Sequence, residues 1–303
     1  MTGDAVVRDA LTGDAVIIAP HRQARPNLPA GDCPFCVGGL EAPEAYETRW
    51  FANRWPSFPN DRAEIHLFSP DHEATLASLG PVGVRKVVDL WAERTGAPGA
   101  RLDVAYVLLF ENSGRDAGAT IAHPHGQAFA YTEVPDRPAR ELEGACVLCR
   151  APDPELVVLS VGGWSAWVPA AATSPFELRL APATHVADLP SLEARSRDDL
   201  AEVLSNVLAR LDALFDQPMP RMTWIHQRPF DGRAWPSAHL HLHIQPLLRA
   251  RGSLRYVAGG ELGGGIFVNP VAPADAAAAL RSVSGHIDGA RAASGVVPET
   301  PVR

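Results

Sequence analysis

The sequence lacks both an excess of positive charge and a long apolar run. Its 303 residues include 27 Lys and Arg against 35 Asp and Glu, a formal net charge of −8. Nucleic acids and acidic membranes attract clustered lysine and arginine, so this balance argues against both as general partners. No apolar stretch reaches the about 18 residues of a membrane span, and the first residues show no basic segment followed by an apolar run. We therefore expect a cytoplasmic protein.

Cysteine is also scarce. The four cysteines form two Cys-x-x-Cys pairs, Cys33 with Cys36 and Cys146 with Cys149. In a reducing compartment such pairs favour metal binding over a disulfide. A redox dithiol is the rival explanation for either pair taken alone, so the neighbouring histidines have to decide.

The spacing of metal-ligand residues repeats along the chain. The separation of Cys36 from His72 equals that of Cys149 from His185. Each half then reaches a His-x-His-x-Gln segment, "HPHGQ" in the first and "HLHIQ" in the second. This repeat indicates an internal duplication.

A connector separates the two halves of the repeat. The stretch "TEVPDRPARELE" has the proline and charge content of a linker, so we place the halves at residues 1–135 and 136–303. Strand-like runs such as "AYVLLFE" and "FELRLAP" occur in both halves. Helical periodicity is clearest at residues 81–95 and 196–215, and a further helix is indicated at 273–291. We predict an α+β fold of two units, with helices on one face of antiparallel sheets.

The duplication predicts two metal sites. Zinc takes four tetrahedral ligands, and structural sites use thiolate and imidazole. Buried free thiols and scattered surface histidines would not explain why the intervals agree. We therefore predict two zinc ions per chain, one held by Cys33, Cys36, His72 and His123, the other by Cys146, Cys149, His185 and His241.

His125 is left free once His123 is assigned to zinc. Residues i and i+2 of a strand share one face, so both rings and Gln127 point the same way. A rigidly held imidazole can attack phosphorus and form a covalent intermediate. Gln127 can donate a hydrogen bond to a phosphoryl oxygen but cannot protonate a leaving group, which favours transfer over rapid hydrolysis. Gly126 would let a phosphate approach the backbone.

The segment "FENSGRDAGATIAHPHGQ" closely resembles the active-site segment of galactose-1-phosphate uridylyltransferases. These form a branch of the histidine-triad superfamily in which glutamine replaces the third triad histidine. The likeness covers nearly the whole chain, because "PHRQARP", "CPFC", "FANRWPSF", "SPDH", "WIHQRPF" and "GGELGGGIFVNP" also follow the family order. The resemblance implies two histidine-triad-like halves, a homodimer with sites completed across the interface, and a ping-pong reaction through His125.

The same resemblance implies further substrate contacts. They are Arg22 and Arg25 near the phosphates, Asn53 and Trp55 around the ribose and base, Asn112 beside the catalytic loop, and Thr120 as a phosphate-contacting hydroxyl. At the sugar end, Glu261 is retained and Arg255 stands where the family carries lysine. Gly260 replaces an aromatic hydroxyl, so the likeness does not identify the hexose.

The second metal site has an alternative. Some family members bind metal there with a glutamate and three histidines, and this chain has Glu141, His226, His241 and His243 at those positions. The second cysteine pair favours the zinc set, which resembles the two-zinc arrangement of plant ADP-glucose phosphorylase. His241 serves in either scheme.

The sequence leaves several functions to compare. The leading prediction is a nucleotidyltransferase acting on a nucleotide-sugar and a sugar 1-phosphate, by default UDP-glucose and galactose 1-phosphate. An ADP-sugar phosphorylase using the same His125 is the alternative, and no residue decides the base. A hydrolase would use His239, His241 and His243 as a triad, although that repeat equally fits a decayed copy. A zinc-ribbon-like interaction module would explain the cysteines but not "HPHGQ".

Overall fold

The structure, a computed structural model, describes residues 6–24, 32–58 and 61–284. Its strands are β1 (Val6–Arg8), β2 (Ala15–Ile17), β3 (Arg49–Ala52), β4 (Ala63–Leu67), β5 (Tyr106–Ser113), β6 (His125–Tyr131), β7 (Val157–Val161), β8 (Trp164–Trp167), β9 (Leu178–Pro182), β10 (Arg221–His226), β11 (His241–Pro246), β12 (Leu248–Ala250) and β13 (Ser253–Leu254). Its α-helices are α1 (Gly80–Gly99), α2 (Asp136–Glu141), α3 (Ala194–Leu214), α4 (Gly259–Gly264) and α5 (Pro273–Ser282), with 3-10 turns at Pro20–Ala24, Arg115–Ala117 and Val147–Cys149.

One nine-stranded antiparallel sheet runs through both halves of the duplication. Its order is β3-β4-β6-β5-β10-β11-β9-β8-β7. The halves meet where β5 pairs with β10, with Glu111 opposite Thr223. On either side of this seam the order β4-β6-β5 is mirrored by β9-β11-β10. The division at residue 135 falls just before α2 and stays a prediction.

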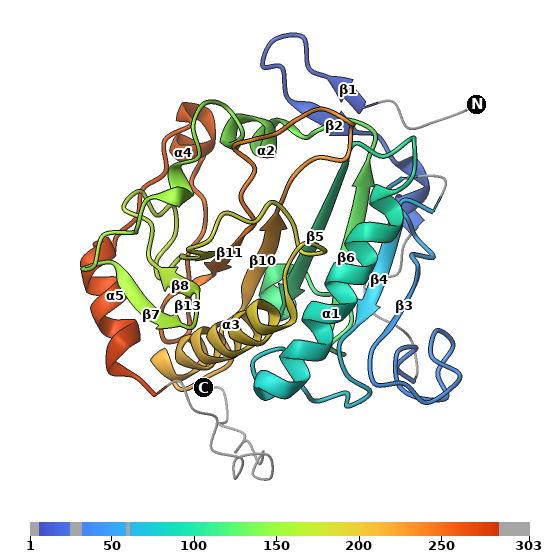
Figure 1. The fold of residues 1–303 in the computed structure, drawn as a ribbon. Coiled ribbons are helices and arrows are strands. Elements are labelled where there is room, and N and C mark those ends of the chain that lie inside the picture. Colours follow the sequence, from blue (N-terminus) through green and yellow to red (C-terminus); the bar gives the residue numbers. More distant parts are fainter. Residues whose placement is uncertain (1–5, 25–31, 59–60, 285–303) are drawn as a thin grey trace, which may run out of the picture.

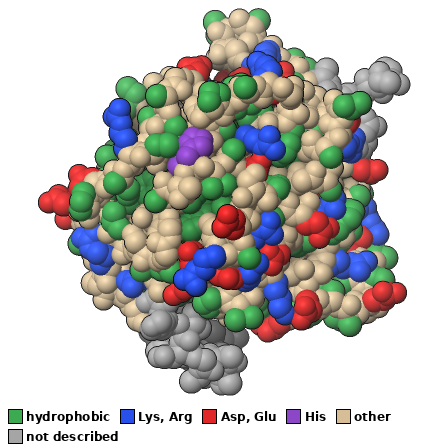
Figure 2. Space-filling model, in the orientation of Figure 1, with side chains coloured by type: hydrophobic (Ala, Val, Ile, Leu, Met, Phe, Trp, Pro, Cys, Tyr) green, Lys and Arg blue, Asp and Glu red, His purple; other side chains and the backbone are tan. Residues whose placement is uncertain are grey.

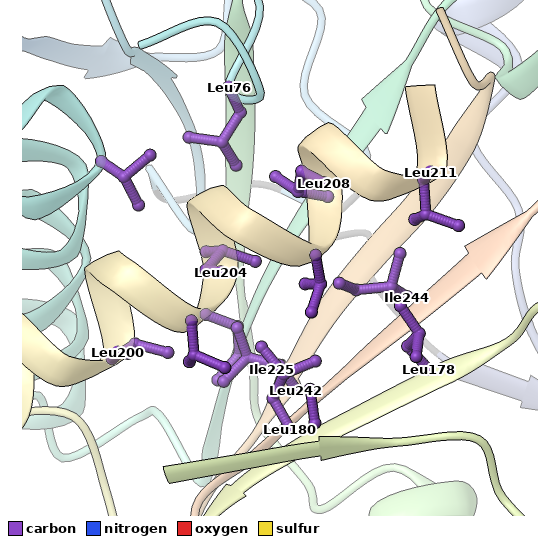
Figure 3. Packing of buried hydrophobic residues seen from close by; sticks show 14 of the residues in the cluster. Leu76, Leu178, Leu180, Leu200, Leu204, Leu208, Leu211, Ile225, Leu242 and Ile244 are labelled. Atoms are coloured by element: carbon purple, nitrogen blue, oxygen red, sulfur yellow. The ribbon is translucent and has the colours of Figure 1, made fainter. Parts of the chain in front are cut away.

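The helices α1 and α3 lie across one face of this sheet (Figure 1). Four leucines of α3 recur at intervals of three and four residues and are fully buried: Leu200, Leu204, Leu208 and Leu211. They belong to one core cluster with residues of β9, β10 and β11, which Figure 3 shows beneath the helix: Leu178, Leu180, Ile225, Leu242 and Ile244. Each fully buried leucine contributes about 1.5–3 kcal/mol, so this contact stabilises the sheet of the second half strongly.

The predicted fold class is confirmed. Mixed α and β elements form antiparallel pairs, and the two long helices cover one face, as expected. α1 and α3 extend over the helices predicted at 81–95 and 196–215 to within a few residues. The third predicted helix is α5, which ends at Ser282, and residues from 285 onward lie outside the described part of the chain.

Basic and acidic side chains are interspersed on the helix-covered face (Figure 2). Arg85 and Arg197 form ion pairs with Asp198 and Asp89, which tie α1 to α3 at 2.5 and 3.1 Å. Exposed pairs of this kind are worth about 0–1 kcal/mol each, so they orient the helices more than they stabilise them. Among the described residues, no helix has the combined length and apolarity of a membrane span.

The face of β6 that points away from the helices carries the predicted catalytic residues. Along β6, half-buried His125 and Gln127 alternate with buried Gly126 and Ala128. Ala128 lies in the core cluster beneath the helices, so His125 and Gln127 face the opposite side. This arrangement confirms that the two side chains share one face of the strand.

Candidate active site and metal clusters

The first predicted metal set is assembled as expected. The ligand atoms of Cys33, Cys36, His72 and His123 all lie within 4.8 Å of one another. The Sγ atom of Cys36 is 3.4 Å from Nδ1 of His72 and 3.7 Å from Nδ1 of His123. The Nε2 atom of His123 donates to the Ser69 carbonyl at 2.8 Å, which leaves Nδ1 as the ligand atom. Burial holds the pKa of His123 below its usual value, so the ring is neutral, as a metal ligand must be.

Tyr46 borders this cluster, and no feature of the sequence identified it beforehand. Its hydroxyl lies 2.7 Å from the Phe35 carbonyl, 3.0 Å from the Ser69 carbonyl and 2.8 Å from Nε2 of His123. Groups bonded to the outer nitrogen of a ligating histidine fix its tautomer and orientation. A single tyrosine between two loops has no spacing pattern that could have identified it.

The metal cluster and His125, the predicted catalytic histidine, are directly linked. His125 donates Nδ1–H to the carbonyl oxygen of His123 at 2.8 Å. Its Nε2 atom therefore carries the lone pair. The ring of Phe35, which lies between the two cysteines, packs edge-on against the His125 ring with centroids 5.2 Å apart. The loop that would hold a metal ion thus also orients the predicted nucleophile.

Two cavities meet at His125. One, of about 550 Å³, is lined by Phe35, Phe51, Asn53, Trp55 and Gln127 and is named here the Trp55 cavity. The other, of about 540 Å³, is lined by Glu111, Asn112 and Met219 and is named the Asn112 cavity. His125, Thr120 and Ile121 border both. Each volume falls in the about 300–1,000 Å³ range of small-molecule sites, so a ligand could lie on each side of the histidine.

Several predicted substrate residues lie away from these cavities. Arg22 donates to the hydroxyl of Ser57 and lines neither cavity, and Arg25 lies outside the described residues. Arg255 and Glu261 form an ion pair with each other and also line neither cavity. Glu261 accepts hydrogen bonds from the backbone N–H groups of Ala258 and Val268, both at 2.7 Å, and these hold its pKa below the usual range.

The structure gives a different reason for a glycine at position 126 from the one expected. A Cβ atom at this position would lie 2.7 Å from Cζ of Phe68 and 3.0 Å from the Phe110 carbonyl oxygen. A side chain here would thus point into the core and not toward the cavities. The glycine makes room for the Phe68 ring, and the geometry gives no support for a role in admitting phosphate.

The second thiolate cluster differs from the prediction at one ligand. Its members are Cys146, Cys149, His185 and His239, with ligand atoms within 4.8 Å. His239 stands where His241 was expected. The correct register matches His239 to His123: Nε2 of His239 lies 2.9 Å from the Pro182 carbonyl, and its own carbonyl accepts from Nδ1 of His241 at 2.7 Å. The run "HLHLH" contains both His239 and His241, so the sequence pattern alone allows either one as the ligand.

The alternative metal set is also assembled, and at the same time. Glu141, His226, His241 and His243 form a third cluster within 4.8 Å, which we call the tetrad. The Oε2 atom of Glu141 lies 2.5 Å from Nδ1 of His226 and 3.2 Å from Nε2 of His241. Burial alone would raise the pKa of Glu141, but these two histidines hold it well below its usual range. Because His241 is not needed by the cysteines, the two sets do not compete.

The tetrad has the properties of a metal site. His243 is 1% exposed, and neither of its ring nitrogens has a hydrogen-bond partner. Burial, followed by the neighbouring His241 and His226, lowers the pKa of His243, so its ring is neutral. A buried imidazole without partners is costly unless another ligand satisfies it. Three imidazoles and a carboxylate are a donor set that transition metals accept.

The comparisons with known proteins cover most of the chain. The galactose-1-phosphate uridyl transferase N-terminal domain matches residues 52–135, and the C-terminal domain of the same family matches residues 147–288. A galactose-1-phosphate uridylyltransferase of Thermotoga maritima is 32% identical over 91% of this chain and 98% of its own length. An ADP-glucose phosphorylase of Arabidopsis thaliana is 26% identical over 91% of this chain and 92% of its own.

Solved structures give the same result. A uridylyltransferase structure matches with a TM-score of 0.84 and 30% identity, covering 91% of this chain and 96% of its own. The Arabidopsis thaliana ADP-glucose phosphorylase with bound ADP-glucose matches with a TM-score of 0.76 and 26% identity, covering 93% of this chain and 99% of its own. The predicted family resemblance and the predicted enzyme class are confirmed.

Proposed function

The chain belongs to the galactose-1-phosphate uridylyltransferase family, and from this premise we propose that it moves UMP from a UDP-hexose to a hexose 1-phosphate. The observation that carries the proposal is the geometry of His125. Its Nδ1–H is committed to the His123 carbonyl, and its ring borders two cavities. A nucleophile bordered by two such cavities suits a reaction in which a donor and an acceptor use it in turn.

The proposed first half-reaction begins with the lone pair on Nε2 of His125. This nitrogen attacks the α-phosphorus of the UDP-hexose and forms an N–P bond. The bond from that phosphorus to the bridging oxygen breaks, and the hexose 1-phosphate leaves with the electron pair. The nucleoside would occupy the Trp55 cavity, where Phe35 and Phe51 offer apolar surface and Asn53 and Trp55 lie at the same wall.

The second half-reaction reverses these bonds with a new acceptor. A phosphate oxygen of another hexose 1-phosphate attacks the same phosphorus, the N–P bond breaks, and Nε2 regains its lone pair. Gln127 would donate an amide N–H hydrogen bond to a phosphoryl oxygen, but its amide is not acidic and cannot protonate a leaving group. A sugar phosphate leaves as a stable anion, so the proposed reaction needs no general acid at this position.

An ADP-sugar phosphorylase is the second candidate. In that reaction AMP would pass through the same His125 to inorganic phosphate. The likeness to the Arabidopsis thaliana ADP-glucose phosphorylase, over 91% of this chain, supports this candidate. A hydrolase in the second half has less support, because the cavity beside His241 measures about 120 Å³ and Glu141 lines it.

The donor sets support zinc in both thiolate clusters. Two thiolates with two imidazoles make the closed tetrahedral site that zinc favours for structural purposes. The tetrad, with oxygen and nitrogen donors only, suits a further transition-metal ion. The proposed total is therefore three metal ions per chain, one more than the two predicted from the sequence. The ions of the thiolate clusters would supply folding energy and would hold His123 and His239 in place.

The proposed reaction predicts a covalent nucleotidyl-enzyme. Protein mixed briefly with UDP-glucose should gain the mass of one UMP, because Nε2 of His125 retains the group until an acceptor arrives. Intact mass spectrometry measures this gain, with ADP-glucose in a parallel sample to identify the base. The His125→Ala variant should show no adduct. An AMP adduct alone would favour the phosphorylase, and no adduct from either donor would exclude both candidates.

We also propose that the protein acts as a homodimer. Tyr256, Leu262 and Ile266 are 77, 73 and 75% exposed, on a segment that begins at Arg255 and contains Glu261. Clustered exposed apolar side chains indicate an interaction surface. Since Arg255 and Glu261 line neither cavity of their own chain, a second copy would give this segment a place beside the partner's site.

Charge on this segment should separate the dimer. Leu262→Asp combined with Ile266→Asp would place two carboxylates in an apolar interface. Light scattering should then give the mass of one chain, and the KM for hexose 1-phosphate should rise. Leu102→Asp is the matched control, because Leu102 is fully exposed but lies far along the chain from this segment, and it should leave the dimer intact. A wild-type protein that is monomeric at working concentrations would contradict the proposal.

A further inference from the structure

The two metal clusters of the second half share one strand and one cavity. His239 precedes β11, and His241 is its first residue. His239 directs Nδ1 toward Cys146 and Cys149, with Sγ atoms at 3.4 and 3.9 Å. Residues of both clusters, Cys146 and His239 on one side and Glu141 and His241 on the other, line the same cavity. The two clusters therefore share no ligand, but they line one cavity.

Three hydrogen bonds connect the clusters. The His239 carbonyl accepts from Nδ1 of His241 at 2.7 Å, which turns Nε2 of His241 toward Glu141. The backbone N–H of Leu240 donates to the carbonyl of Val186, the residue after His185, at 2.7 Å. The hydroxyl of Ser237 donates to the carbonyl of Leu142, the residue after Glu141, at 2.6 Å. The first bond thus joins a tetrad ligand to the backbone of a thiolate-cluster ligand, and the other two join residues that lie next to, or two positions from, ligands of the two clusters.

We propose that metal ions bind cooperatively to these two clusters of the second half. The inference rests on the metal loading proposed above. An ion on the thiolates fixes His239, and the carbonyl of His239 then holds the His241 ring in the orientation and tautomer that the tetrad needs. Glu141 depends on the same ion, because only four residues separate it from Cys146 and both belong to one connection between β6 and β7.

The expected size of the effect follows from the role of the His239 carbonyl. It is an outer partner of a ligating histidine, and loss of such partners typically lowers metal affinity by about 10–100-fold. The coupling is reciprocal, since each ion must change the affinity for the other by the same factor. The two ions of this half would therefore be gained and lost together.

Cobalt(II) distinguishes a thiolate cluster from the tetrad by its absorption spectrum. Cobalt bound by thiolates shows an intense thiolate-to-metal charge-transfer band, whereas cobalt in the tetrad, which has no sulfur ligand, does not. Wild-type protein should first be shown to contain three metal ions per chain. Total bound cobalt, measured after equilibration at buffered free cobalt concentrations, less the thiolate-bound fraction, then gives occupancy of the tetrad.

The decisive variant is Cys149→Ser. Cys149 is exposed, so its replacement disturbs little packing while it removes a thiolate. Tetrad affinity should fall by about 10–100-fold. Cys36→Ser is the matched control, because it removes a thiolate from the first half, where the equivalent carbonyl holds His125 and not a tetrad ligand. It should leave tetrad affinity unchanged.

Glu141→Gln tests the reverse direction and keeps the inference testable if Cys149→Ser does not fold. Its tetrad would be empty. The part of the charge-transfer band that is lost in Cys149→Ser, which reports the second thiolate cluster, should therefore require a cobalt concentration higher by the same factor. Equal tetrad affinity in wild type and Cys149→Ser, or an unchanged band in Glu141→Gln, would overturn the coupling but not the three-ion count. Fewer than three ions in the wild type would overturn the metal loading itself.

Discussion

Replacement of His125 by alanine is expected to lower the rate of uridylyl transfer by about 10⁴- to 10⁶-fold, the range found when a nucleophile or its partner is removed from other enzymes. Alanine cannot form the N–P bond, so transfer would require direct attack of one sugar phosphate on the other. Both substrates are anionic, and they border the histidine from different cavities in the proposed reaction. The loss should therefore appear in kcat more than in KM.

The measurement is steady-state turnover with UDP-glucose and galactose 1-phosphate. His125→Gln is the companion variant, because glutamine keeps a polar side chain under Phe35 but cannot attack phosphorus. Metal content and melting temperature should match the wild type in both variants, since His125 belongs to no metal cluster. Turnover within about 10-fold of the wild type would mean that the phosphorus is transferred in a single displacement, and the proposed intermediate would be wrong.

Replacement of Cys33 by serine is expected to have the largest effect on stability. A structural zinc contributes roughly 10–16 kcal/mol to the folding of small zinc domains, so the loss of one ligand of four should cost about 2.5–4 kcal/mol. Whole domains are stable by only about 5–15 kcal/mol. The cluster lies against a small core of Phe35, Ala42, Ile65 and Leu67, which has few other contacts to compensate.

Thermal unfolding and zinc content test this expectation together. Val37→Ser is the matched control, because Val37 is half exposed in the same loop and is not a ligand. It should retain zinc and unfold near the wild-type temperature. Folded Cys33→Ser protein should still form the nucleotidyl adduct. The free energy of unfolding should fall by more than the activation free energy of adduct formation rises. A variant of full stability without activity would instead show that the ion takes part in catalysis.

The alternation of strand residues made it predictable that His125 and Gln127 share one face. His123 and His125 lie two apart, and the structure places one in a metal cluster and the other between two cavities. The first metal set was predicted correctly from the repeated spacing, although His125 lies only two residues from the ligand His123. In the second half, the same period of two led to the wrong ligand, His241 in place of His239. His239, His241 and His243 satisfy the pattern equally. The register is fixed in the fold by the contacts of His239 with Cys146 and Pro182, and by the hydrogen bond from His241 to its carbonyl.

Other features depend on contacts that no local pattern records. Phe68 lies far from Gly126 in sequence, so the space that requires a glycine is visible only in the fold. The ion pair of Arg255 with Glu261 likewise emerges only when the segment folds back on itself. The family resemblance placed these residues near substrate. The contacts within one chain show instead what holds the segment in shape.

The pairing of β5 with β10 gives the duplicated halves a freedom that two identical subunits do not have. In a symmetric pair, every substitution appears in both copies, so a change that improves one site alters the other equally. Here the two halves are encoded separately and joined by a covalent connector. One half could keep Gln127 beside its nucleophile while the other acquired His243 and Glu141 at the corresponding place. Separate encoding thus lets the chemistry proposed at His125 and the metal binding proposed at the tetrad diverge within a single sheet.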